Sequence, residues 1–192
     1  MKACRTLIPI KLVDLHLYNF LFLTKKINVE NALSKLVGQF AHLPEEEKIQ
    51  GITKTVGSFV KFTGHSGVRY EKMTTHEVVV SLENKAEVQN HIHQIHATAM
   101  ILLAETATGM VVGMNIPDDR VMLVKSLNTA FVKRSTGAMR ATATLSDEMI
   151  KIIHETEKGE LLIPVVISDE VGEEPIKVEA LWAWIPKSRL KK

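Results

Sequence analysis

The residue that most clearly suggests a chemical role is Glu105, a carboxylate in the middle of an apolar stretch. Leu102, Leu103 and Ala104 come directly before it. Burying a carboxylate among such neighbours costs on the order of several kcal/mol unless it is partnered or protonated. A carboxylate held in a dry environment can act as a general base or as a nucleophile. The alternative is a structural carboxylate that caps a neighbouring loop or faces a watery groove.

Three histidines, His91, His93 and His96, come shortly before Glu105 in the sequence. His-x-His spacing can put two imidazoles on one side of a strand, which suggests a metal site. No cysteine and no nearby aspartate completes such a site, so we expect no metal. We expect instead that His91 and His93 lie in a loop and that His96 orients the first turn of a helix.

The segment 96–114 reads as one helix, with Glu105 as its only charge. A charge near the middle and the many threonines and glycines argue against a helix that spans a membrane. The segment also carries small residues that let a sheet approach closely, namely Ala97, Ala99, Ala104, Ala107, Gly109 and Gly113. A helix that is apolar nearly all round is a core helix, so we predict that a sheet wraps it.

Alternating polar and apolar residues predict strands on both sides of this helix. Before it, residues 68–70 and 78–82 are expected to form two strands joined by a turn near Thr74 and Thr75. After a loop at 115–119, β-type patterns cover 121–132, 139–145, 161–167 and 176–184, with turn signals at 135–137, 158–160 and 172–175. Two strands, one helix and about four further strands indicate an α+β fold with an antiparallel sheet around a long central helix.

The first third of the chain predicts helices. Asn28 is the expected N-cap of a first helix whose apolar stripe is Val29, Leu33, Leu36, Val37 and Phe40. A second helix is expected to start near Pro44 and to end at Gly64. The chain of 192 residues suits one domain with a helical appendage. We therefore divide it into an N-terminal helical extension, 1–63, and a main domain, 64–192.

Composition disfavours several classes of function. With 24 Lys and Arg against 22 Asp and Glu, the net charge of +2 gives no broad field for binding nucleic acid. A single cysteine, Cys4, cannot form an intramolecular disulfide and fits a reducing, cytoplasmic compartment. The apolar segment 7–23 is interrupted by Lys11, Asp14 and His16, which argues against a signal peptide or a membrane span. We expect a docking or interfacial segment there, with membrane contact as an open alternative.

Residues 90–110, NHIHQIHATAMILLAETATGM, resemble the signature of hot-dog-fold acyl-CoA thioesterases of the phenylacetate-pathway type. In that signature an Asn precedes the His of a His-Gly-Gly turn by six residues, and an acidic residue follows the His by nine. Asn90, His96 and Glu105 have these two spacings. Residues 126–134 are similar to the central strand of the same family, whose aromatic residue corresponds to Phe131.

The resemblance covers roughly residues 64–186 and implies a hot-dog domain that hydrolyses acyl-CoA thioesters without a cofactor. The backbone amide of Ala97, at the helix N-terminus, would stabilise negative charge on the thioester oxygen. Glu105 would activate water or attack directly, and Asn90 would orient the water or the carbonyl. Since Ala97 and Glu105 are roughly 12 Å apart along one helix, we predict a site shared by a homodimer, alone or paired into a tetramer.

One departure from the family pattern bears on the activity. Ala97 and Thr98 stand where the family has Gly-Gly, so Thr98 brings side-chain bulk to the site together with a hydroxyl that is a candidate second donor to substrate. Two alternatives therefore stay open. One is a non-catalytic hot-dog module that binds acyl-CoA or lipid. The other is a hydratase or dehydratase, in which His96 and Glu105 would converge on the substrate α and β carbons.

Overall fold

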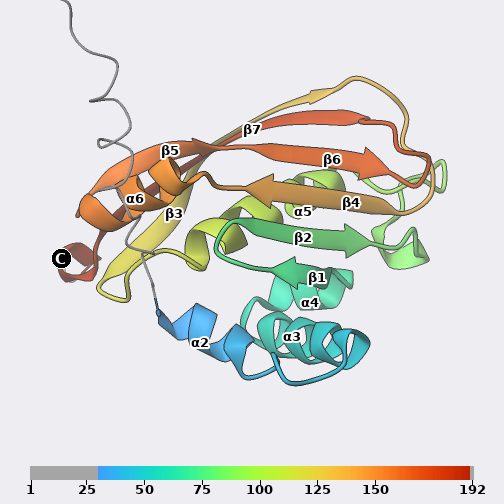
Figure 1. The fold of residues 1–192 in the computed structure, drawn as a ribbon. Coiled ribbons are helices and arrows are strands. Elements are labelled where there is room, and N and C mark those ends of the chain that lie inside the picture. The colour runs from blue at the N-terminus through green and yellow to red at the C-terminus, as the bar shows by residue number, and fades with distance from the viewer. Residues whose placement is uncertain (1–29, 191–192) are drawn as a thin grey trace, which may run out of the picture.

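The computed structural model describes residues 30–190, and helix α5 (Ala97–Gly113) lies at its centre. Antiparallel strands curve around this helix (Figure 1). The strands are β1 (Arg69–Met73), β2 (Glu77–Leu82), β3 (Arg120–Phe131), β4 (Met139–Thr144), β5 (Gly159–Ile163), β6 (Val165–Asp169) and β7 (Ile176–Pro186). Single 3-10 turns cover Ala86–Val88 and Lys187–Leu190. The wrapped central helix and the α+β class are confirmed.

The strands form two sheets, ordered β1-β2-β4-β6 and β3-β7-β5, in which every pair is antiparallel. β5 and β6 follow one another in the chain and are separated only by Pro164. Proline has no N–H to donate to a ladder, so it suits the point where the chain leaves one sheet for the other. The two sheets are thus continuous through the chain at Pro164, and together they curve around α5 (Figure 1).

Two details of the predicted strands were wrong. The single strand expected at 161–167 is two strands, because Pro164 interrupts the ladder. The turn expected at 158–160 overlaps the start of β5, where Gly159 lies against the Trp184 ring: a Cβ on this glycine would come within 2.4 Å of it. Glycine here serves close packing between β5 and β7 rather than a turn.

The close approach of β7 to α5 depends on small residues in the helix. A Cβ on Gly109 would lie 2.7 Å from the Trp182 ring, so only glycine fits beneath this indole. The Trp182 Nε1–H donates to the Thr108 hydroxyl at 2.9 Å, and that hydroxyl donates to the Ala104 carbonyl at 2.7 Å. The indole therefore packs on the helix and is hydrogen-bonded to it.

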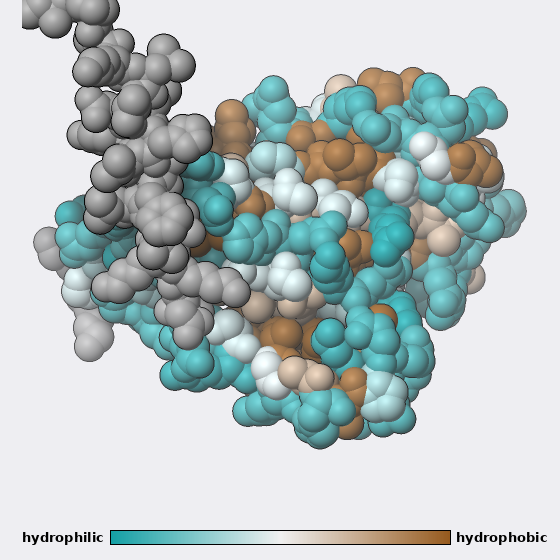
Figure 2. All heavy atoms as spheres, viewed as in Figure 1, coloured by the Kyte–Doolittle hydropathy of each residue, from teal (hydrophilic) through white to brown (hydrophobic). Residues whose placement is uncertain are grey.

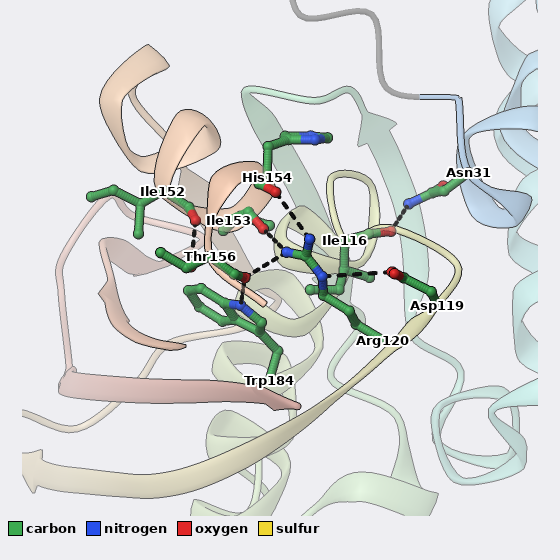
Figure 3. Close-up of polar contacts among 9 residues, drawn as sticks. All are labelled: Asn31, Ile116, Asp119, Arg120, Ile152, Ile153, His154, Thr156 and Trp184. Atoms are coloured by element: carbon green, nitrogen blue, oxygen red, sulfur yellow. Dashed lines mark hydrogen bonds and ion pairs between the residues drawn. The ribbon is translucent and has the colours of Figure 1, made fainter. Parts of the chain in front are cut away.

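Helix α6 (Asp147–Glu155), which the sequence analysis did not anticipate, follows β4. The Ser146 hydroxyl accepts the Met149 N–H at 3.3 Å and caps its first turn. Its C-terminal carbonyls are held by Arg120 of β3, whose guanidinium donates to Ile153 O at 2.6 Å and to His154 O at 3.0 Å (Figure 3). A planar cation with several donors suits the exposed carbonyls at a helix C-terminus.

The first described helix, α2 (Ala32–Gly38), is capped by Asn31 rather than by the predicted Asn28, which lies outside the described residues. The Asn31 Oδ1 accepts the Ser34 N–H at 2.8 Å. Its Nδ2 donates to the carbonyls of Gly113 and Ile116, both at 2.7 Å. Asn31 therefore begins α2 and also ties it to the end of α5, a contact between distant parts of the chain that no local pattern indicates.

The second predicted helix is two helices, α3 (Glu45–Phe59) and α4 (Lys61–Ser66), because the backbone breaks at Val60 with φ −96° and ψ 78°. Gly64 therefore does not end the helix. It lies within α4, with its backbone against Gly57 of α3, and a Cβ there would come within 2.5 Å of the Gly57 carbonyl oxygen. The glycine that follows α4 is Gly67, at φ +74°. The domain boundary at residues 63 and 64 stays a prediction.

Cys4 and the apolar segment 7–23 lie outside the described residues, so the interfacial role of that segment also stays a prediction. Across residues 30–190, no helix has both the length and the apolar character that crossing a bilayer requires.

Candidate active site

The start of α5 is organised by His96, which caps the helix as predicted. Its backbone is extended, and its Nδ1 accepts the Thr98 N–H at 3.1 Å. A nitrogen that accepts this bond carries no proton, so the Thr98 hydroxyl, 2.8 Å away, must donate to the same atom. The hydroxyl that the sequence suggested as a donor to substrate is used within the chain.

The N–H of Ala97 is the first of the helix and has no acceptor within residues 30–190. The N–H groups that follow do have acceptors: Thr98 donates to the His96 ring, and Ala99 donates to the His96 carbonyl at 2.9 Å. An open N–H at the positive end of a helix of 17 residues suits an oxygen that gains negative charge.

Asn90 lies in the loop that leads into α5. Its Oδ1 accepts the N–H groups of Ile92 and Gln94 at 3.0 and 3.2 Å. His93, between these residues, adopts a positive φ of 60°. The Asn90 side chain thus holds the loop in shape, while its Nδ2 donors have no acceptor in the described part of the chain. The Asn90 amide is half-buried and can donate to a ligand.

Glu105 lies in the middle of α5, between buried Ala104 and buried Thr106. Its carboxylate is half-buried and has no hydrogen bond or ion pair within residues 30–190. Burial raises the pKa of the Glu105 carboxyl above its ordinary value. The pKa of Tyr70 is also raised, mainly because its hydroxyl is buried. A hydrogen bond to Thr63 lowers this pKa in part, and the negative charge of Glu105 raises it further. An unpaired carboxylate with a raised pKa is suited to accept a proton.

The structure places His96, Ala97 and Thr98 at the start of α5, with Asn90 in the preceding loop, while Glu105 lies about two turns further along the helix. Eight residues correspond to roughly 12 Å along the axis. No group of three or more His, Cys, Asp or Glu that could hold a metal ion occurs within residues 30–190.

A hollow of about 220 Å³ lies beside the start of α5, with walls that include His96, Thr98 and Val88. Phe62 of α4 forms another wall, and the sequence analysis did not identify it. Its signal was weak, because Phe62 follows the predicted apolar face of a helix expected to run on to Gly64. Its position depends on the break at Val60.

A larger hollow of about 670 Å³ lies on the outer face of the four-stranded sheet, and none of the predicted site residues lines it. It is lined by side chains that include Arg69, Glu71 and Arg140, two of which pair with each other, Arg140 with Glu71 at 2.6 Å. Figure 2 shows this side of the molecule as mostly hydrophilic. Because its charges pair among themselves, this hollow is a weaker candidate site than the start of α5.

Solved structures share this fold. A probable thioesterase from Pseudomonas aeruginosa is 26% identical, with 75% of this chain and 97% of that chain covered and a TM-score of 0.63. A mutant thioesterase from the same organism is 16% identical, with 76% and 96% covered and a TM-score of 0.56. A mutant thioesterase from Staphylococcus aureus is 18% identical, with 66% and 99% covered and a TM-score of 0.56. No relative among curated proteins matches the sequence.

The fold and its neighbours define a hot-dog-fold protein of the thioesterase superfamily, which confirms the predicted fold and superfamily. Residues 50–185, most of the chain, match a family described as a domain of unknown function, DUF4442. The chain belongs to that family.

Proposed function

We propose that this protein is a thioesterase that hydrolyses acyl-CoA at a site shared by two protomers. One observation carries the proposal. The half-buried Glu105 carboxylate has no partner within residues 30–190, and the Ala97 N–H on the same helix has no acceptor there. A base and an oxyanion donor are the two groups that thioester hydrolysis requires.

In the proposed reaction, Glu105 takes a proton from water as the water oxygen bonds to the thioester carbonyl carbon. Negative charge develops on the carbonyl oxygen, where the Ala97 N–H stabilises it. The tetrahedral intermediate then collapses, the C–S bond breaks, and the CoA thiolate leaves and takes up the proton held by Glu105. Asn90 orients the carbonyl or the attacking water through its Nδ2 donors. Direct attack by the carboxylate is the variant in which Glu105 acts as a nucleophile.

Ala97 and Glu105 of one chain are separated by roughly 12 Å along the helix, so one thioester group cannot contact both. In the proposed site, Ala97 of one protomer therefore acts with Glu105 of the partner subunit. Strand β3 supports such a pairing, since it is an edge strand of 12 residues with exposed Leu123 and Val124. A long edge with apolar side chains favours pairing with a second strand. We propose a homodimer, alone or as a pair of dimers.

Relatives give further support. Solved structures with the same fold are named as thioesterases. In two mutant structures of one Staphylococcus aureus thioesterase, the residues replaced by alanine are a glutamine and a glutamate that follows it by 15 residues. Asn90 and Glu105 are also 15 residues apart. This spacing favours the same pair of positions in this chain.

The second candidate is a module that binds acyl-CoA without hydrolysing it. The Thr98 side chain favours it, because it stands at the site where the family signature has glycine and its hydroxyl is bonded to His96. A crowded oxyanion donor stabilises a transition state less well.

The experiment is a hydrolysis screen with Glu105→Gln. Wild-type protein is assayed against acetyl-, hexanoyl-, palmitoyl- and phenylacetyl-CoA by the CoA thiol released. We expect turnover by wild type, none by Glu105→Gln, and wild-type rates for the control Glu155→Gln, an exposed carboxylate on α6. Binding of an acyl-CoA by both proteins without turnover by either would favour the binding module.

A further inference from the structure

Helix α4 carries an exposed aromatic side chain on a rigid support. Thr63, 1% exposed, accepts the Tyr70 hydroxyl at 3.0 Å and donates to the Val60 carbonyl at 2.8 Å. Gly64 lies with its backbone against Gly57 of α3. These contacts fix the short helix on β1 and on α3. Phe62, the residue before Thr63, is 69% exposed on this anchored backbone.

Phe62 faces the start of α5. It lines the hollow of about 220 Å³ whose other walls include Val88, His96 and Thr98. The open N–H of Ala97 belongs to the residue between His96 and Thr98. An aromatic side chain from the N-terminal helices and the residues on either side of the proposed oxyanion donor therefore line one hollow.

The hollow is open to solvent, so its volume of about 220 Å³ does not by itself exclude a long acyl chain. Phe62 is the aromatic side chain in its wall, so an acyl chain that lies along the hollow would contact Phe62 or be stopped by it.

We propose that Phe62 sets the acyl-chain preference of the site, by contacting short acyl groups and blocking long ones. This inference rests on the proposed function, since it assumes that the thioester carbonyl lies at Ala97. Phe62 is then a specificity-determining residue supplied by the helices that precede the sheet.

The test measures binding separately from hydrolysis. S-butyl-CoA and S-octyl-CoA are thioethers with no carbonyl to hydrolyse, and calorimetry gives their Kd values for wild type, Phe62→Ala and Phe59→Ala. Phe59, 74% exposed at the end of α3, is the matched control because it does not line the hollow. Melting temperatures of all three proteins exclude a loss of fold.

We expect Phe62→Ala to weaken S-butyl-CoA binding by about tenfold, the scale of one lost apolar contact in a pocket. It should leave S-octyl-CoA unchanged or bound more tightly, so that the preference between the two chains changes. Phe59→Ala should keep the wild-type preference. In hydrolysis, KM should follow the same order while kcat stays within about twofold.

Equal effects of Phe62→Ala and Phe59→Ala on the two thioethers would overturn the inference, as would no measurable binding of either thioether by wild type. A change of oligomeric mass in Phe62→Ala with an unchanged chain preference would assign Phe62 to a protein interface and also overturn it. The proposed function fails independently, when wild type binds the thioethers but releases no thiol from any acyl-CoA.

Discussion

The imidazole of His96 accepts two hydrogen bonds from Thr98, one from its N–H at 3.1 Å and one from its hydroxyl at 2.8 Å. This pair closes the first turn of α5 and leaves the Ala97 N–H as the open donor beside it. Thr98 therefore supports the turn, and in the proposed function its methyl group is the bulk that would crowd the oxyanion.

Thr98→Gly separates these two effects. The variant keeps the N–H bond to His96 and removes the hydroxyl and the methyl group, at a cost of about 1 kcal/mol from the helix propensity of glycine. We expect kcat for acyl-CoA hydrolysis to stay the same or rise, because the oxyanion gains space. Thr98→Ser, which keeps the hydroxyl, is the control. If Thr98→Gly abolished hydrolysis with the fold intact and Thr98→Ser did not, the hydroxyl would be a working donor and the crowding account would be wrong.

The raised pKa of Glu105 predicts how activity depends on pH. If the ionised carboxylate is the base, hydrolysis falls as pH drops through this pKa, which burial holds above the ordinary glutamate value. A pH profile of kcat/KM should therefore show an acid limb above the range of an exposed glutamate. An acid limb at the ordinary value would contradict burial as the cause.

The same shift predicts how stability depends on pH. Between the ordinary pKa and the raised one, the folded state binds more protons than the unfolded state, so the free energy of unfolding falls as pH rises. The Glu105→Gln variant has no carboxyl group to ionise at this position, so its free energy of unfolding does not fall in this way as pH rises. The Tm of the variant should therefore rise relative to wild type across this pH range and then stay level. A difference in Tm that did not vary with pH would show that the folded state does not disfavour the ionised form.

The candidate site was predictable from the sequence where its signals are local. The nearly uniform apolar character of residues 96–114 indicates a buried helix, so the charge of Glu105 is conspicuous within it. The role of His96 in the first turn follows from its position at the helix start. The position of Phe62 beside the start of α5 was not predictable, because it depends on the break between α3 and α4 at Val60. Valine carries no turn signal, and the turn depends on packing between two helices.

The fold shows the same division between local and long-range information. Alternation predicted β1 and β2 and the turn between them. By contrast, the bonds of Asn31 to Gly113 and Ile116, more than 80 residues away, could not be predicted. Its capping bond to Ser34 is a local signal that the prediction, which chose Asn28, did not use. Pro164 and the Ser146 cap of α6 were signals present in the sequence, and both describe local chemistry that the prediction did not use.

Packing of β7 on α5 gives a prediction about stability. Thr108→Val removes the acceptor of the Trp182 indole N–H and leaves a buried donor unpaired, at about 1–3 kcal/mol. Thr106→Val is the matched control, because the Thr106 hydroxyl is buried and has no hydrogen-bond partner within residues 30–190. We expect a Tm lowered by several degrees for Thr108→Val and little change for Thr106→Val. Equal melting temperatures for the two variants would show that the indole bond adds nothing to stability.

The edge of β3 gives the prediction about assembly. Leu123 is 56% exposed on this edge strand, and Leu123→Glu would bring two like charges to a β3 interface, once from each protomer. We expect wild type to be a dimer or tetramer at micromolar concentration and Leu123→Glu to be a folded monomer, measured by sedimentation and circular dichroism. Leu162→Glu, at a leucine of β5 that is 58% exposed, should keep the wild-type mass.

Hydrolysis by the same variants tests whether the site is shared. If Ala97 works with Glu105 of the partner subunit, Leu123→Glu loses turnover together with dimerisation, although each protomer keeps both residues. Turnover should return in proportion to the dimer fraction as protein concentration rises, whereas a site within one chain gives a specific activity independent of concentration. A monomeric Leu123→Glu with the full wild-type rate would show that one chain holds the complete site, and a strictly monomeric wild type would remove the basis for pairing at β3.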